Sequence, residues 1–405
     1  MPEPAIPLAR PEVGDAEAQA VARVLASGWL AQGPEVEAFE HEFASYVGAP
    51  HAIAVSSGTA ALVLALQVCD VGPGDEVVTA SHSFIATANA IRLVGALPVF
   101  VDVDPATYNI DPARIEAVLS PRTRAIVCVH QMGMPCDLAA LVALSRRCRL
   151  VLIEDAACAA GSEIRWDGAW QRIGRPHGDL ACFSFHPRKL LTTGEGGMIT
   201  TANGEWSARL RRLRQHGMSV AAHVRHRSAS VSSESYEELG HNFRMSDVHA
   251  AIGRVQLARL TDMVSRRRRL AERYRRGLSG VAALTLPVEP AGARSNWQSF
   301  AVRLSPSLDQ RAVMQALLDR GIATRRGIMN AHREPAYPRG TWACVDGGRE
   351  SGRHESRSDD DWGDALRCSE RAQDRTILLP LWGAMTDAEQ DTVTDALIEI
   401  AGPSQ

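Results

Sequence analysis

Short apolar runs recur through the first half of the chain and alternate with longer stretches of helical periodicity. The runs are rich in β-branched and aliphatic residues, whereas the longer stretches repeat apolar residues every three or four positions. The predicted strands are His51–Val55, Glu76–Ala80, Leu97–Val101, Ala125–His130, Leu150–Glu154, Leu180–Phe185 and Gly197–Thr201. The predicted helices are Asp15–Ser27, Glu35–Tyr46, Ala60–Val68, Ile85–Val94, Pro112–Leu119 and Leu138–Cys148. This alternation predicts an α/β fold with a mostly parallel sheet covered by helices on both faces.

The pattern changes from about Ala250 onward. The elements predicted there are a long helix over Ala250–Gly277, a strand over Asn296–Leu304, and helices over Leu308–Arg320 and Thr386–Ile400. We therefore expect a large domain over residues 1–255 and a smaller C-terminal α/β domain over residues 256–405.

Two polar stretches, Ser219–Glu238 and Arg339–Asp364, have too few apolar residues to predict packed structure. Such segments bury too little surface to offset the entropy lost on ordering. We expect surface loops or disorder, with residues 339–364 as a flexible insertion in the small domain. A lid over a substrate is the alternative.

The composition is that of an ordinary soluble globular enzyme. Of its 405 residues, 45% are hydrophobic and 22% are charged. The net charge of −3 gives no electrostatic reason to expect nucleic acid as a partner, and the basic run Arg266–Arg269 is interpreted as a solvated helix face. No apolar stretch is long enough to span a membrane, and the first ten residues do not have the pattern of a signal peptide.

Eight cysteines are spread along the chain, and no two of them form a CxxC pair. Neither a disulfide scaffold nor a zinc site is therefore expected, and no metal is predicted. Free thiols are typical of a reduced, cytoplasmic protein.

Residues that can bind a phosphate follow the first predicted strand. Gly58, Thr59 and Ala60 open a helix there, and the free N–H groups and dipole of a helix N-terminus attract phosphate. The same Ser-Gly-Thr pattern is also an ordinary helix cap. Phe84 lies between a strand and a helix, where it is either a core residue or a planar group that stacks on a ligand ring.

Two charged residues stand at or after strand ends further along the chain. Asp155 ends the fifth predicted strand, where an open parallel sheet forms its ligand crevice. Its carboxylate is either a helix cap or a partner for a protonated pyridine nitrogen. Lys189 lies in a glycine-rich loop after Ser184, whose hydroxyl at a strand end is expected to be a further phosphate ligand. A lysine, an acid, a phosphate cradle and a planar group together are what pyridoxal 5'-phosphate (PLP) requires.

Several longer motifs occur in the same chain order. They are Ser27-Gly28-Trp29-Leu30, Ser56–Leu62, Pro73–Val77, Phe84–Asn89, Glu154–Ala157, Phe183–Gly197 and Gly240–Met245. With these motifs the sequence resembles the DegT/DnrJ/StrS family of PLP-dependent sugar aminotransferases, which have the fold-type I aminotransferase architecture. The resemblance runs from about Ile6 to the last predicted helix, and Arg339–Asp364 is its weakest part.

The resemblance implies a role for each matching residue. Lys189 corresponds to the lysine that forms a Schiff base with PLP, and Asp155 to the acid beside the pyridine nitrogen. Further contacts to the cofactor are implied for Gly58, Thr59, Ala60, Phe84, Cys158 and Ser184.

A second implication concerns the assembly. Asn242 matches an asparagine that reaches the phosphate of the neighbouring subunit's cofactor, which implies a homodimer with shared active sites. Two positions depart from the family, since Cys158 and Ala160 stand where it often has glutamine and histidine. A thiol is only a weak hydrogen-bond partner, so cofactor tuning on this side is expected to differ.

The function implied by the resemblance is transamination. Glutamate or glutamine would donate the amino group through Lys189, and a nucleotide-linked keto sugar would accept it. A cyclitol or another cyclic ketone is an alternative acceptor, and a non-catalytic PLP-binding regulator is an alternative class of protein. A dinucleotide-binding oxidoreductase would need a GxGxxG fingerprint after the first strand, which is missing. Residues that either contact the substrate or are structural are Trp29, His186, Arg244, His332 and Tyr337.

Overall fold

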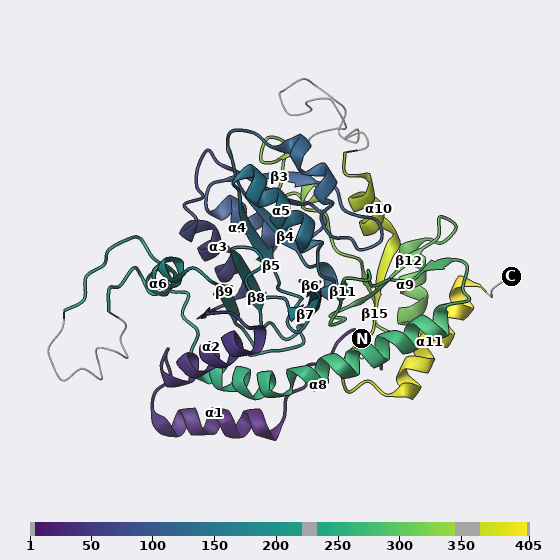
Figure 1. The fold of residues 1–405 in the computed structure, drawn as a ribbon. Helices are drawn as coiled ribbons and strands as arrows, with labels where there is room; N and C mark the ends of the chain where they lie inside the picture. The colour runs from purple at the N-terminus through teal and green to yellow at the C-terminus, as the bar shows by residue number, and fades with distance from the viewer. Residues whose placement is uncertain (1–4, 221–232, 345–364, 403–405) are drawn as a thin grey trace.

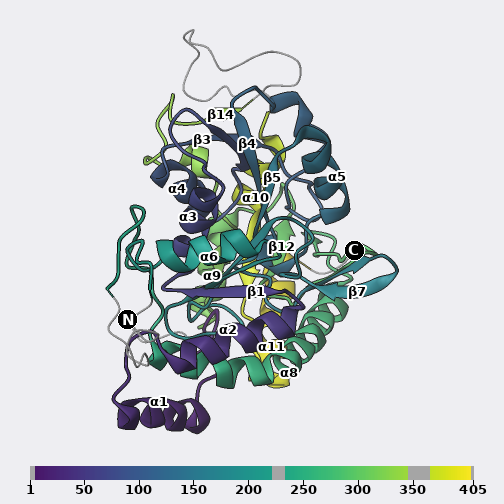
Figure 2. The same cartoon turned by 60° about the vertical axis from the view of Figure 1, so that its left-hand side comes forward.

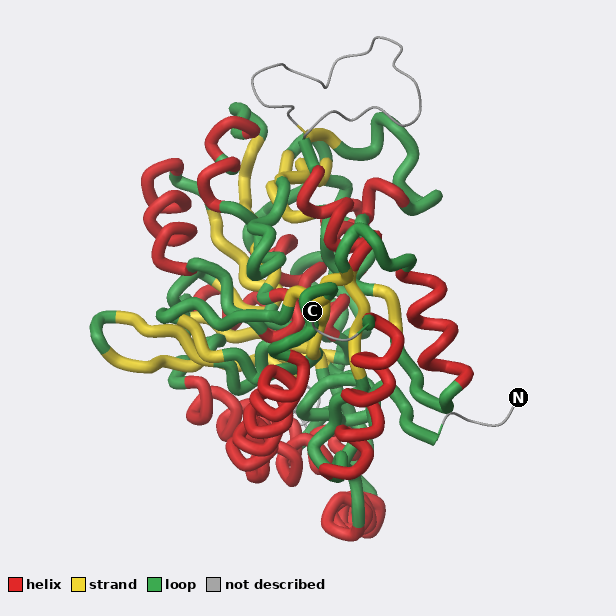
Figure 3. The backbone as a smooth tube through the Cα atoms, turned by 90° about the vertical axis from the view of Figure 1, so that its right-hand side faces the viewer, coloured by secondary structure: helices red, strands yellow, loops and turns green. Residues whose placement is uncertain are grey.

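The computed structural model describes residues 5–220, 233–344 and 365–402. Most strands lie in the interior with helices around them, and one hairpin projects from the body (Figure 3). The α-helices are α1 (Asp15–Ser27), α2 (Pro34–Val47), α3 (Gly58–Val68), α4 (Ala86–Leu93), α5 (Leu138–Cys148), α6 (Gly204–Leu213), α8 (Asp247–Leu278), α9 (Gln310–Asp319), α10 (Arg367–Arg375) and α11 (Asp387–Ala401).

The central sheet has eight strands in the described part of the chain. Their spatial order is β1 (His51–Val55), β9 (Gly197–Thr201), β8 (Leu180–Ser184), β5 (Val151–Asp155), β4 (Thr123–Val129), β2 (Glu76–Ala80), β3 (Leu97–Val101) and β14 (Ala343–Cys344). Strand β9 is antiparallel to both of its neighbours, and the remaining pairs are parallel. The mostly parallel sheet is therefore confirmed, and the carboxyl ends of β2, β4, β5 and β8 lie along one edge.

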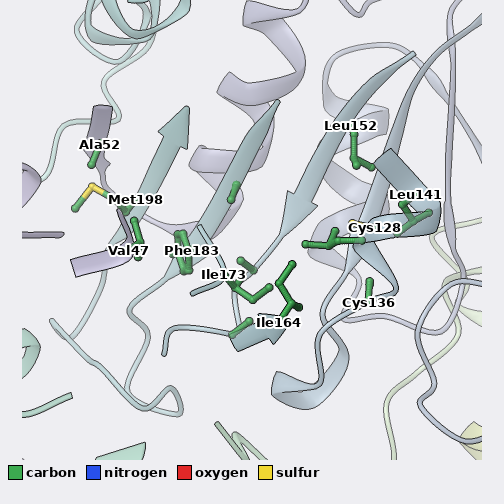
Figure 4. Packing of buried hydrophobic residues seen from close by; sticks show 14 of the residues in the cluster. Val47, Ala52, Cys128, Cys136, Leu141, Leu152, Ile164, Ile173, Phe183 and Met198 are labelled. Atoms are coloured by element: carbon green, nitrogen blue, oxygen red, sulfur yellow. The ribbon is translucent and has the colours of Figure 1, made fainter. Parts of the chain in front are cut away.

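Apolar side chains cover the sheet on both faces because successive residues of a strand point to opposite sides. In β4, Ala125 and Val127 pack in the cluster that includes α3, while Ile126 and Cys128 pack in the cluster that includes α2 and α5. Figure 4 shows Leu141 of α5 against the strands in this second cluster. Burial on both faces explains why the sequence of these strands is continuously apolar rather than alternating.

A smaller sheet follows in the chain, built from β10 (Leu284–Thr285), β12 (Phe300–Leu304), β15 (Thr376–Leu379) and β13 (Arg325–Arg326). Helices α9 and α11 share its apolar cluster. Helix α8 runs along the base of the molecule, with α1 and α2 near its start and α11 near its end (Figure 1). The domain boundary expected after residue 255 falls inside this helix, and β14 returns to the large sheet.

Several short pieces of the fold differ from the sequence-based prediction, and β15 of the small sheet is among the strands that were not predicted. Pro112–Leu119 does not form an α-helix but two 3-10 segments, Pro112–Arg114 and Glu116–Val118. The segment runs into Pro121, which favours an extended residue before it, and Leu119 is already extended. The hairpin of β6 (Glu163–Trp166) and β7 (Ala169–Arg172), which projects from the molecule in Figure 2, was not predicted, and neither were α6 and α10.

Two further expectations were wrong in part. The strand expected from Asn296 starts only at Phe300, because Trp297 takes a left-handed φ of 53°. Within the expected solvated run, Arg267 is buried and donates to backbone carbonyls.

The expected polar stretches are only partly described. Trp342 and Cys344 are buried at the edge of the sheet, so the beginning of the second stretch is packed. Residues 221–232 of the first and 345–364 of the second lie outside the described residues. None of the described helices is long and apolar enough to cross a membrane. Within the same ranges, no group of three or more His, Cys, Asp or Glu side chains is placed to hold a metal ion.

Candidate active site

Asp155 ends β5 as a buried carboxylate that is only 4% exposed. Its Oδ2 accepts a hydrogen bond from Thr87 Oγ1 at 2.7 Å, and its Oδ1 accepts one from the amide of Ala157 at 3.1 Å. The hydroxyl of Ser83 lies 2.8 Å from that of Thr87, and because Thr87 donates to Asp155, Ser83 donates to Thr87. These bonds use two of about four acceptor positions on the carboxylate, which leaves room for a cationic N–H group.

Lys189 reaches the turn that follows Asp155. Its Nζ lies 3.0 Å from Sγ of Cys158, three residues after the acid in the sequence. The loop that carries Lys189 begins at the end of the neighbouring strand β8, and the Lys189 amide donates to the carbonyl of His186 at 2.8 Å. The structure thus brings the predicted lysine and the turn of the predicted acid together.

The amino-acid composition itself singles out Lys189. The chain contains 43 arginines but a single lysine, and that lysine is Lys189. Arginine replaces lysine in most surface roles, but a guanidinium does not form an imine with an aldehyde, whereas a primary amine does. The only ε-amine of the chain therefore lies beside the turn that follows Asp155.

The predicted phosphate site forms where α3 meets β8. Ser57 caps α3 by accepting from the amide of Ala60 at 3.1 Å, which leaves the amides of Gly58 and Thr59 at the helix N-terminus without intrahelical acceptors. A Cβ at Gly58 would lie only 2.7 Å from Cβ of Ser184. Gly58 is therefore needed for close packing, and the two predicted phosphate ligands are in contact.

The other predicted cofactor residues lie further out on this chain. Phe84 precedes α4 with 59% of its surface exposed, and Asn242 is also exposed in the single chain. Arg244 is bridged to Val55 at the end of β1, three residues before Gly58. Trp29 lies after α1, and its Nε1 donates to the carbonyl of Gln32 at 3.2 Å.

His332 and Tyr337, both predicted as substrate contacts, are buried and already hydrogen-bonded. Nδ1 of His332 lies 2.7 Å from the Ser81 hydroxyl and Nε2 lies 3.2 Å from Glu370, a bond that lowers the pKa of that carboxyl. The hydroxyl of Tyr337 donates to Asn89 at 2.7 Å, and burial raises the pKa of Tyr337 to about 12. Both residues thus fasten the segment 331–337 to the elements after β2. His186 is half-buried, and its Nδ1 accepts from the amide of Arg188.

Three residues of the site were not found by sequence reasoning, namely Thr87, Asn296 and Gln298. Thr87 lies within a motif that was recognised, three residues after Phe84. Asn296 and Gln298 contact the turn of Cys158 and the loop of Lys189 from more than 100 positions away in the chain. No local pattern reveals contacts of that range.

Comparison with known proteins agrees with this geometry. The DegT/DnrJ/EryC1/StrS aminotransferase family matches residues 11–343. The spore coat polysaccharide biosynthesis protein SpsC of Bacillus subtilis (strain 168) is 38% identical over 399 residues, which are 98% of this chain and 97% of SpsC.

Two solved structures are similar over nearly their whole length. The aminotransferase TlmJ from Streptoalloteichus hindustanus has a TM-score of 0.84 and 37% identity, and the match covers 97% of each chain. S. venezuelae DesV, solved in complex with a ketimine intermediate, has a TM-score of 0.84 and 34% identity over 99% of this chain and 100% of its own. The expected fold-type I architecture and enzyme class are thereby confirmed. The chain belongs to the DegT/DnrJ/EryC1/StrS family of PLP-dependent aminotransferases.

Proposed function

We propose that this enzyme transfers an amino group from glutamate or glutamine to the carbonyl carbon of a keto sugar, and that this sugar is linked to a nucleotide. The observation that carries the proposal is the position of Lys189, the only lysine of the chain, beside the turn that follows the buried Asp155. The relative SpsC, named for spore coat polysaccharide biosynthesis, supports a sugar as the acceptor.

The described residues fit PLP. Lys189 would bind its aldehyde carbon, Asp155 would face the pyridine nitrogen, and Gly58, Thr59 and Ser184 would hold the phosphate. The acceptor positions left open on the Asp155 carboxylate and the close approach of Gly58 to Ser184 are the features that favour this fit. When bound, PLP supplies an electron sink for the charge left on the substrate carbon after proton removal.

Lys189 is the group placed to move that proton. As a free amine, its Nζ would take the α-proton of the amino donor. In the second half of the reaction it would return a proton to the carbon of the acceptor that gains the amino group. Its contact at 3.0 Å is the thiol of Cys158, a weak hydrogen-bond acceptor, so the contact orients the amine without binding it strongly. The Asp155 carboxylate, held by the Thr87 hydroxyl and the Ala157 amide, would pair with the pyridine nitrogen.

The acceptor would enter on the side of Arg244 and Trp29. Arg244 lies next to the strand end that precedes Gly58, where its guanidinium could bind a diphosphate. His186, near Lys189 in sequence, is a further candidate contact. His332 and Tyr337 are buried behind the β2 side of the crevice, where they would shape its wall.

The same enzyme is proposed to work as a homodimer. Apolar side chains lie exposed on the segment just before Asn242 in the single chain, namely Leu239 at 91% and Tyr236 at 61%. A second subunit would cover them and would bring Asn242 to its partner's phosphate site. Mixed dimers of Lys189→Ala and Asn242→Ala chains test this, because each mixed dimer has one fully intact site if the sites are shared. Activity should recover to about a quarter of wild type on mixing, and no recovery would contradict shared sites.

The reaction itself is tested with purified protein, PLP, glutamate or glutamine, and a panel of ketones. The panel contains nucleotide-linked 3-keto and 4-keto sugars, the corresponding free sugars and cyclitol ketones. Formation of an amino sugar nucleotide, with much slower turnover of the free sugar, is the expected result. Preference for a cyclitol ketone would replace the proposed acceptor.

A further inference from the structure

A four-residue segment, Ser295–Gln298, lies just before β12 of the small sheet and contacts both the loop of Lys189 and the turn of Cys158. We call it the strap. The side chain of Gln298 accepts at Oε1 from the amide of Leu190 at 3.1 Å and donates from Nε2 to the carbonyl of Arg188. Both backbone neighbours of Lys189 are therefore held by one glutamine.

A second side chain of the strap, Asn296, binds the backbone at Cys158, the residue whose thiol contacts the Lys189 amine. Nδ2 of Asn296 donates to the carbonyls of Cys158 at 2.8 Å and of Ala160 at 2.9 Å. Oδ1 of Asn296 accepts from the backbone amide of Gln298 at 2.9 Å, so the Asn296 side chain is also tied to the backbone of the residue that carries the second side chain. The backbones of Lys189 and Cys158, whose side chains meet at 3.0 Å, are thus fixed relative to each other.

The strap is rigid enough to act as a reference. Asn296 is 0% exposed and Gln298 is 9% exposed. Trp297 between them has a φ of 53°, a left-handed conformation that costs a bulky residue energy and persists only when its surroundings impose it. Arg267 of α8 imposes it in part, since its Nη1 donates to the carbonyls of Trp297 at 3.2 Å and Gln298 at 3.1 Å. Burial of this guanidinium lowers the pKa of Arg267 to about 10.

We propose that Gln298 and Asn296 are positioning residues for transamination, which hold Lys189 and Cys158 in register through their backbones. This leaves the Lys189 side chain free to alternate between a covalent bond and a free amine, while its origin stays in place. The inference rests on the proposed role of Lys189. We call the hydrogen bonds of Gln298 and Asn296 to these two backbones the clamp. Misplacement of a catalytic group by about 1 Å can cost about a hundredfold in rate, so loss of the clamp is expected to slow turnover.

The decisive variant is Gln298→Met, which fills the same space without either hydrogen bond. Gln298→Glu keeps the acceptor for the Leu190 amide and serves as the conservative variant. Gln310→Met is the matched control, because Gln310 also bridges two backbone groups, the carbonyls of Gln373 and Thr376, but within the small sheet and away from Lys189.

Two measurements on the protein without PLP test the clamp independently of turnover. The first is amide hydrogen exchange at Leu190, which should become faster in Gln298→Met and stay unchanged in Gln310→Met. The second is the rate at which a soluble amine-selective reagent modifies Lys189, read from the intact mass because the chain has no other lysine. Peptide mass spectrometry separates this modification from that of the N-terminal amine, and the rate at Lys189 should rise several-fold in Gln298→Met alone.

With PLP bound, Gln298→Met should lose roughly tenfold or more in kcat with little change in KM for the amino donor, and Gln298→Glu should recover part of the loss. The proposal is overturned if Gln298→Met matches Gln310→Met in exchange, labelling and kcat. If Gln298→Met does not fold, the same comparison between Gln298→Glu and Gln310→Met decides. Should Lys189 not bind PLP in the wild-type protein, the proposed function fails, while exchange and labelling still report on the clamp.

Discussion

The two charged residues of the crevice are held in different ways. Asp155 is enclosed, and its carboxylate receives direct hydrogen bonds from the Thr87 hydroxyl and the Ala157 amide. Lys189 is only half-buried, its amine touches one weak acceptor, and its position comes from backbone bonds to Gln298. A charge that stays in one place throughout the reaction is fixed at the side chain. A group that must form and break a bond is fixed at its backbone, which leaves the side chain free.

The largest effect is expected from Lys189→Arg, which keeps the positive charge and removes the primary amine. Transamination should fall by about a thousandfold or more, since both the covalent link and the proton transfer are lost. Steady-state turnover with glutamate and the preferred ketone measures it. Turnover within tenfold of wild type would show that charge alone suffices at this position and would remove the basis of the comparison.

Thr87→Val tests how Asp155 is held. This change deletes the hydrogen bond to Asp155 with little change in volume, and a bond to a charged group is worth about 1.5–3 kcal/mol, so kcat should fall about tenfold to a hundredfold. Thr79→Val is the control, because the Thr79 hydroxyl is also buried but donates to the carbonyl of Val127 instead. Equal losses in the two variants would mean that the bond to Asp155 has no special role.

A smaller effect is expected from Cys158→Ala, which removes the 3.0 Å contact of the Lys189 amine with the thiol. The thiol is a weak acceptor, and the backbone on both sides of Lys189 is held by Gln298. We therefore expect kcat to change by less than about threefold. A loss of more than tenfold would show that the side-chain contact, rather than the backbone, positions the lysine.

The smallest effect on turnover at neutral pH, but a measurable one on stability, is expected at His82. Burial lowers its pKa to about 4 from an ordinary value of 6.5. The unfolded chain therefore binds a proton between these pH values while the folded chain does not, so stability falls as the pH drops from about 6.5 to 4, by about 3 kcal/mol at most.

Urea denaturation across this pH range compares wild type with His82→Gln, which cannot titrate. The variant should show a flatter dependence of the unfolding free energy on pH than the wild type. If the unfolding free energies of wild type and His82→Gln depended on pH in the same way, His82 would not be a buried neutral histidine beside the hydrogen bonds that link Ser83, Thr87 and Asp155.

Much of the central sheet could be predicted from the sequence because its strands are buried on both faces and so appear as unbroken apolar runs. The acid and the phosphate ligands followed from this, since Asp155 and Ser184 stand where two such runs end. Segments with mixed polarity gave no such signal, as in the β6–β7 hairpin and α10. The strap was hidden for a further reason: Asn296 and Gln298 were assigned to a strand, and their partners lie far away in the chain.

Reductive trapping of PLP with borohydride tests the central claim most directly, because the chain has one lysine. The account predicts one reduced adduct per chain, located by peptide mass spectrometry on the segment Phe183–Gly197 at Lys189, and none in Lys189→Arg. An adduct at the N-terminal amine alone, or full transamination by a protein in which Lys189 remains unmodified, would contradict it.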